Sequence, residues 1–460
     1  MATFSSMTRK TIIRTTAAGA LMFFFIGICI HFFWKLQAQK EGAETDLYAS
    51  VPRDCTAIIE TGRISNLVSE LADFRQTAHT PPLPEISPLF TLLKQNLATK
   101  EGKALSKKID QMLISFHASG KDNKNQIIYC RLISSATEQT ESLIDNVLSP
   151  FPPKKYIYRG EEITIYPLKD AAFIACYSSD GFLAVSYQKK LIEKVIDTRL
   201  SGKSILKDKS FTHSHDRKRV NTTASFYVRY PIPGKWTEFD IKLSDKTAYI
   251  SGICAEDKEE PEIADIPSDK VIPRYTVYMH QEEAGRDSIL PGNNTYCLFY
   301  SDETAKQLQS INYIPITDTQ EADRIKTNMH YLRFYKTTDR WHTIYTFKDK
   351  YACFYNDGLL IAPKDSCIYN YIHCMEDEDT LELNCPYQQT LADVNEKSGS
   401  FLFANLSDVL CLPHAEVSRI PEFFFRYKEY FKHFLMTVQF TYSDGKLSSN
   451  IVLHSISKPS

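Results

Sequence analysis

Apolar and polar residues alternate in many short runs after residue 50, and this pattern predicts β-strands. The run FIACYSSDGFLAVS (173–186) has Asp-Gly at 180–181 between two alternating halves, which predicts a tight hairpin. YACFYNDGLLIAP (351–363) repeats this arrangement. Two further hairpins are predicted at 239–255 and 438–454. We therefore expect antiparallel sheet to be a main element of the fold.

Other segments have helical spacing, and the last of them opens with proline, as helices often do. They are 64–75, 88–98, 103–115, 138–148, 188–199, 302–310 and 421–433. Antiparallel sheets with helices on one face would bury both kinds of pattern, so the expected fold class is α+β.

The stretch from Thr15 to Trp34 contains no charged residue and is long enough to cross a bilayer as a helix. A cleaved signal peptide is the alternative. Apolar cores of signal peptides usually run for about 7–15 residues and end at small residues. This stretch is longer and ends in Phe32, Phe33 and Trp34, so we expect an uncleaved membrane anchor.

Basic residues near the anchor predict its orientation. Arg9, Lys10 and Arg14 lie in the short N-terminal tail, which should stay in the cytoplasm. Residues from about 36 onward would then lie on the extracytoplasmic side.

Charge and composition exclude some partners and favour a folded body. Five of the 54 basic residues and none of the 56 acidic residues lie in 1–40, so the remainder carries a net charge of −7. This balance argues against nucleic-acid binding, which needs clustered basic residues. Aromatic residues make up 12% of the chain, enough for a sizeable core. With about four hundred residues after the anchor, two domains are expected.

Similar segments recur in the same order and indicate an internal duplication. The matched pairs are 51–60 with 272–280, 127–143 with 294–310, 171–186 with 349–363, 223–230 with 399–406, and 239–255 with 438–454. The spacing between partners decreases along the chain. A long helical insert at 64–119, replaced by the short segment 281–293 in the second copy, accounts for the change.

The duplication and the anchor define the expected fold: an N-terminal transmembrane helix, then two tandem α+β repeats of antiparallel sheet with helices packed on it. The expected segments are a cytoplasmic tail (1–14), the anchor (15–34), a juxtamembrane linker (35–50), a first repeat (51–255), an acidic linker (256–270) and a second repeat (271–460).

Ten cysteines lie outside the anchor, and none forms a Cys-x-x-Cys motif. Most stand in apolar strand-like runs, where free thiols behave as small hydrophobic residues. We expect mostly unpaired core cysteines. Any exception should fall among Cys367, Cys374 and Cys385, although their spacing matches no usual zinc site.

Candidate chemistry is sparse, and we predict no catalytic and no cofactor-binding residue. His213, His215 and Asp216 form His-x-His-Asp, whose side chains are transition-metal ligands. A complete site would need further ligands from elsewhere, and the stretch is typical of an exposed basic loop. These residues are weak metal candidates, and we expect neither a metal nor a cofactor.

The order of elements resembles a broad bacterial family of membrane-anchored extracytoplasmic proteins, the DUF3352-like group. The resemblance rests on YRGEEITIYPL (158–168), SSDGFLAVSYQKKLIEKVID (178–197) and SGKSILKDKSF (201–211), and it covers most of the body. The second copy departs from the pattern, because DGLLIAPKDSCIYNYIHCM (357–375) keeps the hairpin but lacks the Lys-rich helix. The resemblance implies a periplasmic location and a shared architecture, and it implies no activity.

Three functions are compatible with these features. The first is a non-enzymatic binding or scaffolding module of the cell envelope, attached to the membrane through 15–34 and engaging an envelope protein. The second is an envelope hydrolase with a site between the repeats. The third is a carrier of a small ligand or lipid within the aromatic interior. The sequence does not set the oligomeric state.

Overall fold

The computed structural model describes fifteen stretches of the chain: residues 46–62, 70, 109–117, 124–132, 151–168, 172–179, 181–212, 222–229, 235–244, 246–256, 264–282, 294–316, 318–337, 340–443 and 446–456. They fall into two compact units. Unit 1 takes its described residues from the ranges up to Cys55 and from Leu92 to Lys207. Unit 2 takes them from Thr56 to Thr91 and from Asp208 to the C-terminal end.

Unit 1 contains a six-stranded antiparallel sheet in the order β2-β3-β7-β6-β5-β4. Its elements are η1 (Leu47–Ser50), β2 (Ile109–His117), β3 (Gln126–Leu132), β4 (Lys154–Tyr158), β5 (Glu161–Pro167), β6 (Phe173–Ser179), β7 (Phe182–Ser186), α6 (Lys189–Ser201) and η4 (Ile205–Lys207). The Asp-Gly turn lies between β6 and β7, as the sequence predicted. The expected hairpin is thus confirmed.

Helix α6 packs on this sheet through one apolar face. Leu191, Ile192, Val195 and Ile196 are buried, and their spacing of three and four residues places them on the same side of the helix. The helix ends at Gly202, which has a φ of 66° and donates its N–H to the Thr198 carbonyl. Glycine accepts this left-handed conformation without a Cβ clash, so the cap stops the helix.

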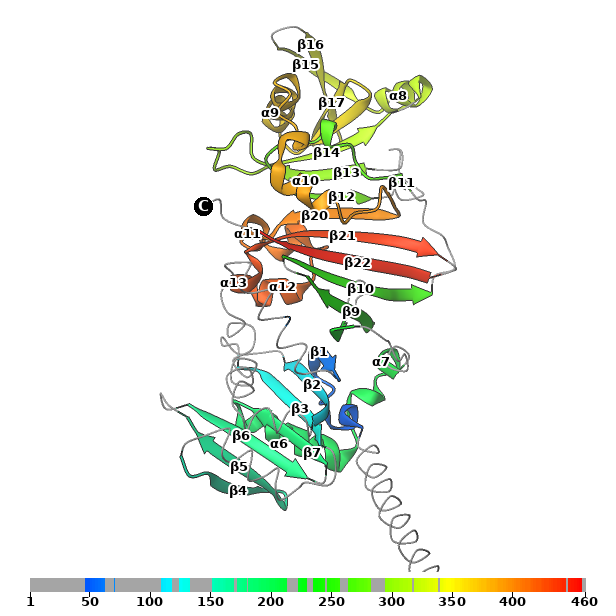
Figure 1. The fold of residues 1–460 in the computed structure, drawn as a ribbon. Coiled ribbons are helices and arrows are strands. Elements are labelled where there is room, and N and C mark those ends of the chain that lie inside the picture. The colour runs from blue at the N-terminus through cyan, green and yellow to red at the C-terminus, as the bar shows by residue number, and fades with distance from the viewer. Residues whose placement is uncertain are drawn as a thin grey trace, which may run out of the picture. The chain divides into compact units, whose positions relative to one another are not determined.

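Unit 2 is built on a longer antiparallel sheet, and the pairings give the order β1-β8-β9-β10-β22-β21-β20-β12-β13-β14-β18-β17-β16-β15 (Figure 1). Its strands are β1 (Cys55–Thr61), β8 (Ala224–Val228), β9 (Thr237–Leu243), β10 (Thr247–Glu256), β12 (Thr276–Glu282), β13 (Asn294–Phe299), β14 (Gln309–Pro315), β15 (His330–Lys336), β16 (Trp341–Phe347), β17 (Lys350–Tyr355), β18 (Gly358–Ala362), β20 (Ser400–Asn405), β21 (Phe434–Ser443) and β22 (Lys446–Ser455). A separate small ladder joins β11 (Ala264–Asp265) to β19 (Lys397–Ser398).

Short helices connect these strands. They are α7 (Lys209–Thr212), η5 (Asp269–Val271), α8 (Thr319–Lys326), α9 (Asp365–Glu376), η6 (Leu381–Leu383), α10 (Cys385–Leu391), α11 (Leu406–Val409), η7 (His414–Val417), α12 (Glu422–Arg426) and α13 (Lys428–Phe431). The predicted hairpins β9–β10, β17–β18 and β21–β22 are confirmed.

Helices cover both faces of the β14–β18 part of unit 2. On one face α9 packs through Ile368, Tyr371 and Ile372 into a core that includes Phe299. On the other face Ile325 of α8 joins a smaller cluster with Met329, Phe347, Leu359 and Ile361. Successive strand residues point to opposite faces, so β18 contributes Leu360 to one core and its neighbours to the other.

The same strand order occurs twice in the described residues. Within unit 1 the order β2-β3-β7-β6-β5-β4 is followed along the chain by α6, and within unit 2 the order β13-β14-β18-β17-β16-β15 is followed by α9. Likewise β1-β8-β9-β10 has the same order as β12-β20-β21-β22. By this order β3 corresponds to β14, so the proposed match of 127–143 with 294–310, which aligns β3 with β13, is wrong by one strand.

The predicted fold class is wrong. The sequence predicted a transmembrane helix followed by two tandem repeats, each a sheet with helices packed on it. Strands instead dominate the described residues, and β10 pairs with β22 over almost their whole length, with one register shift between Ile253 and Ala255. That ladder joins both sets of strands in unit 2 into one sheet. None of the described helices is long and apolar enough to span a membrane.

Individual helix predictions had different outcomes. Segment 188–199 corresponds to α6, while 421–433 divides into α12 and α13 at Tyr427. The described end of 103–115 lies in β2, and 302–310 forms turns that lead into β14. The anchor at 15–34, the cytoplasmic tail and the segments 88–98 and 138–148 lie outside the described residues, as does 64–75 apart from one residue.

Candidate functional site

A chain of polar side chains lies in unit 1 and links Ser115, His117 and Asp54. Ser115 and His117 are two residues apart on β2, so they point to the same face of the sheet. The Ser115 Oγ lies 2.8 Å from the His117 Nε2, and the His117 Nδ1 lies 3.4 Å from the Asp54 Oδ1. Serine, histidine and carboxylate stand in the order found in serine hydrolases.

Two further groups extend this network. The Tyr129 hydroxyl on β3 lies 3.1 Å from the Ser115 Oγ, and the Lys194 ammonium on α6 donates to the Asp54 carboxylate at 2.6 Å. Hydrogen bonding from His117 and Lys194 holds the pKa of Asp54 well below its usual range. Complete burial raises the pKa of Tyr129 well above its ordinary value. Asp54 therefore stays a carboxylate and Tyr129 a neutral phenol at physiological pH.

Burial decides what this arrangement can do. Ser115 is 0% exposed and His117 is 3% exposed, and Tyr129, which hydrogen-bonds to the serine hydroxyl, is buried as well. A nucleophile must reach the carbonyl carbon of its substrate. In this conformation the Ser115 hydroxyl is instead occupied by hydrogen bonds with His117 and Tyr129, which is how buried polar groups are usually accommodated.

A second feature lies at the edge of the sheet in unit 2. Strand β15 pairs with β16 on one side, and no strand of the described residues pairs with it on the other (Figure 1). Tyr331, Phe334 and Trp341 are 58%, 60% and 66% exposed. Edge strands are normally protected by polar or charged side chains, because unpaired backbone groups invite association. We call β15 with Trp341 of β16 the aromatic edge.

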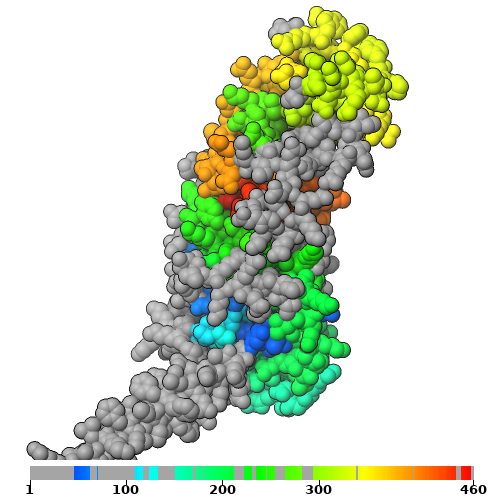
Figure 2. Space-filling view, turned by 90° about the vertical axis from the view of Figure 1, so that its right-hand side faces the viewer, coloured from blue at the N-terminus to red at the C-terminus, as the bar shows by residue number. Residues whose placement is uncertain are grey.

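The rings of the aromatic edge contact one another on one face. The centroids of Tyr331 and Phe334 are 5.3 Å apart, and those of Phe334 and Trp341 are 6.4 Å apart. The Lys336 ammonium lies 5.5 Å from the centroid of Trp341. Exposed apolar clusters of this kind mark interaction surfaces. The yellow-green atoms of this part of the chain lie at the molecular surface in Figure 2.

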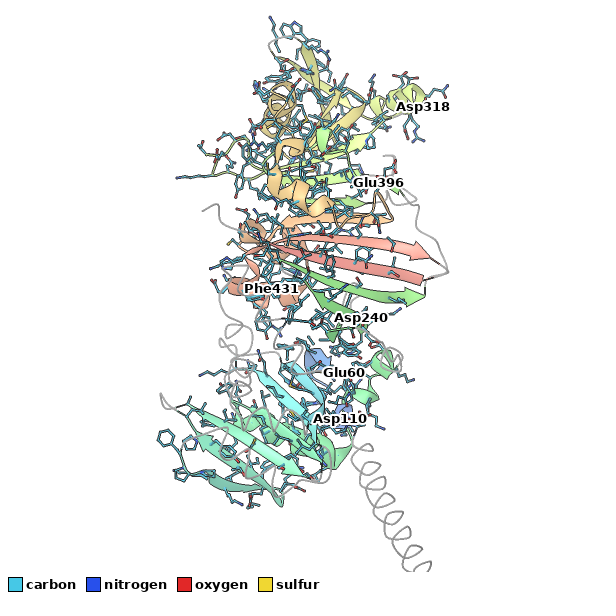
Figure 3. All side chains as sticks on the ribbon, viewed as in Figure 1. Glu60, Asp110, Asp240, Asp318, Glu396 and Phe431 are labelled. Carbon is cyan, nitrogen blue, oxygen red and sulfur yellow. The ribbon has the colours of Figure 1, made fainter. Side chains whose placement is uncertain are left out.

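Neighbouring elements hold the aromatic edge in place. On the opposite face Tyr335 stacks on Tyr369 of α9 with ring centroids 4.0 Å apart, and Arg333 pairs with Asp365 at the start of α9. Helix α8 begins beside Asp318, labelled in Figure 3, whose carboxylate accepts the Gln320 N–H. The edge is thus supported by α9 on one side and left open on the other.

Unit 1 ends in a comparable edge. Strand β4 is last in the strand order of unit 1. It pairs with β5 on one side, and no other strand among the described residues pairs with it on the other. It exposes Tyr156 and Ile157, and the Lys189 ammonium lies 3.8 Å from the Tyr156 ring centroid. The last strands of the two corresponding strand orders, β4 in unit 1 and β15 in unit 2, therefore both expose apolar side chains.

The metal candidates predicted from the sequence are not among the residues that the structure describes. His213, His215 and Asp216 lie outside the described residues, and their role stays a prediction. Among the residues that the structure does describe, no group of three His, Cys, Asp or Glu side chains is placed to hold a metal ion.

The cysteine prediction is confirmed for the nine cysteines whose side chains are described. All nine are free, and only Cys385 and Cys411 of these are exposed. Burial raises the pKa of the Cys130 and Cys353 thiols to about 12 and that of Cys374 to about 11. These thiols are therefore protonated and unreactive at neutral pH.

No family model matches the sequence, and no curated protein matches it. Solved structures with some similarity include crystal form I of TP0453, which is 10% identical with a TM-score of 0.25 and covers 47% of this chain and 82% of that chain. Crystal form III of TP0453 is 10% identical with a TM-score of 0.24, over 71% of this chain and 99% of that chain. Similarity at this level supports no conclusion about fold or function, and the resemblance to the DUF3352-like group stays a prediction.

Proposed function

We propose that this chain is a non-enzymatic binding or scaffolding module of the cell envelope, with its body on the extracytoplasmic side, and that the aromatic edge binds its protein partner. The observation that carries the proposal is the exposure of three contacting aromatic rings at the edge of the sheet, two on the edge strand β15 and one on its neighbour β16. Aromatic residues supply much of the binding energy at protein interfaces. Leaving them exposed on a strand edge without a partner would promote aggregation.

The structure also suggests how such an edge stays folded without its partner. Arg333 is fixed by Asp365, and Tyr335 is fixed by the ring of Tyr369. Side chains on the α9 face thus hold β15 in register, so the exposed face is preorganised. Preorganisation lowers the entropic cost of binding.

A photocrosslinking amino acid tests the proposal in cells that express the full chain. Placed at Trp341, it should give one discrete adduct with another protein. Placed at Leu383, which is exposed to a similar extent in another part of unit 2, it should give none. The Trp341 adduct should also be lost when Phe334 is changed to Ser. No adduct at Trp341, or equal adducts at both positions, would contradict the proposal.

A hydrolase is the second candidate, because Ser115, His117 and Asp54 lie next to one another in the order of a catalytic triad. For it to act, unit 1 would have to open and expose the serine. A fluorophosphonate probe, which modifies activated serines, separates the two functions. A binding module should stay unlabelled, whereas labelling of the parent chain that is lost in Ser115→Ala would favour the hydrolase.

A further inference from the structure

The hydrogen-bond register of the β15–β16 hairpin shows which backbone groups face outward. Thr337 donates its N–H to the Arg340 carbonyl at 3.0 Å, so these residues form a hydrogen-bonded pair at the turn. Such pairs alternate with non-bonded pairs along an antiparallel ladder. Lys336 lies opposite Trp341 and Phe334 lies opposite Thr343, and both are therefore non-bonded pairs. The N–H and C=O groups of Lys336 and Phe334 point away from β16.

These outward groups provide a short template for another strand. Each of the two residues has one donor and one acceptor, so an added strand can form up to four backbone hydrogen bonds there. The register shift between Tyr331 and Arg333 interrupts the regular ladder before this point. A bulge of this kind limits the template to the end of β15 near the turn.

The charge of the template selects among possible occupants. Arg333, which pairs with Asp365, and Lys336 are the charged residues of β15, His330 is its other basic residue, and none of its residues is acidic. A second copy of the chain would place basic residues opposite basic residues, which is destabilising in a strand pair. In an antiparallel pairing centred on Arg333, that residue would face its own copy and His330 would face Lys336.

Ring geometry and backbone chemistry argue against two other ligands. The rings of Tyr331 and Phe334 are inclined by 58°, and those of Phe334 and Trp341 by 83°, so they do not form the flat platform on which a sugar would stack. A lipid surface would bury the aromatic rings. It would leave the outward N–H and C=O groups of Phe334 and Lys336 without partners, which is costly in an apolar medium.

We propose that the aromatic edge binds an extended, acidic peptide segment of its partner as an additional β-strand alongside β15. Backbone hydrogen bonds to Phe334 and Lys336 would hold the segment. Its apolar side chains would contact the ring of Phe334 and its neighbours, and its carboxylates would lie near Lys336. This inference rests on the proposed function and specifies how the partner is recognised.

A defined peptide tests this mode with the full-length protein. The probe is the acetylated peptide Thr-Glu-Thr-Val-Thr-Glu-Thr with a fluorescent label, and binding is followed by anisotropy. Its valine and both glutamates point to one face of the strand, as Phe334 and Lys336 do. Replacing glutamate by lysine should weaken binding by at least about tenfold. N-methylation of alternate backbone amides on one edge of the peptide should abolish binding, while N-methylation on the opposite edge should leave it intact.

Variants of the chain test whether the peptide binds at β15. Lys336→Pro removes an outward N–H at an edge position, where proline is tolerated, and should lower affinity by at least about tenfold without changing the thermal midpoint. Lys336→Gln keeps the backbone donor and should weaken binding less. Trp341→Ala removes an exposed ring and should also weaken binding while the fold persists.

Other results would overturn the inference. Equal binding of both N-methylated peptides, or full binding by Lys336→Pro, would exclude strand addition at this edge. Binding to vesicles of phosphatidylcholine and phosphatidylglycerol that needs Trp341 but tolerates Lys336→Pro would indicate a lipid surface. A dimer lost in Lys336→Pro would indicate a second copy. If the photocrosslink at Trp341 persists in any of these cases, the proposed function stands and only this mode of recognition fails.

Discussion

Replacing Gly252 by alanine should destabilise unit 2, because the position has no room for a Cβ atom. Gly252 lies in β10, opposite Phe239 of β9 and Ser449 of β22. A Cβ there would lie 2.3 Å from the Glu238 carbonyl oxygen and 2.8 Å from the Phe239 Cδ1. The nearer atom belongs to the backbone of β9, so the clash can be relieved only by moving the ladder.

The expected magnitude combines two opposing effects. Forcing extra volume into a packed core costs about 1–3 kcal/mol. Replacing glycine lowers the entropy of the unfolded chain and returns roughly 0.4–1 kcal/mol. Because a backbone atom makes the clash, we expect a net loss of about 1–2 kcal/mol. With a urea dependence of about 2 kcal/mol per molar, the midpoint should fall by about 0.5–1 M.

Urea unfolding followed by tryptophan fluorescence measures this loss. Trp236 is buried in unit 2, and changing Trp34 and Trp341 to Phe leaves it as the reporter. Ser251→Ala is the matched control, since Ser251 precedes Gly252 on the same strand and is exposed; its midpoint should not move. An unchanged or higher midpoint for Gly252→Ala would refute the argument from close packing.

Two further predictions concern titrating groups. In the native protein, iodoacetamide should modify Cys385 and Cys411, and the buried cysteines should react only after unfolding. Peptide mass spectrometry identifies the modified residues, and labelling of a buried thiol in the native protein would contradict the prediction. Burial lowers the pKa of His454 below its usual 6.5, against a smaller opposing effect of Asp393. The unfolded chain then binds the proton more readily, so the contribution of His454 to stability is complete above about pH 6.5 and is lost as pH falls below it. The fall in urea midpoint between pH 7.5 and 5.5 should shrink in His454→Gln, and an unchanged fall would contradict this assignment.

Local patterns predicted the hairpins well because the turn and its flanking strands are adjacent in sequence. The β6–β7 and β17–β18 turns contain Asp-Gly, and Gly181 has the positive φ of 66° that such turns need. Long-range pairings were not predictable in this way. Nothing in the sequence around β10 indicates that its partner is β22, roughly two hundred residues later. The β10–β22 ladder is what makes the sheet of unit 2 continuous.

The candidate sites were missed for physical reasons that can be traced to single strands. Residues 103–115 have apolar spacing that also fits a helix, so β2 was expected to be helical. In a helix Ser115 and His117 would point in different directions, whereas in a strand they share one face. The aromatic edge depends on β15 being last in the strand order, which the composition of HYLRFYK does not reveal.

The C-terminal strand has a consequence for how the protein is made. Strand β22 is the link between β10 and β21, and its last residue is Ser455. A nascent or clipped chain that ends before Lys446 would therefore have two separate sheets in unit 2, each with a long unpaired edge. Such edges are what chaperones and proteases bind. Emergence of the ten-residue strand β22 from the ribosome thus separates chains that can complete unit 2 from those open to degradation.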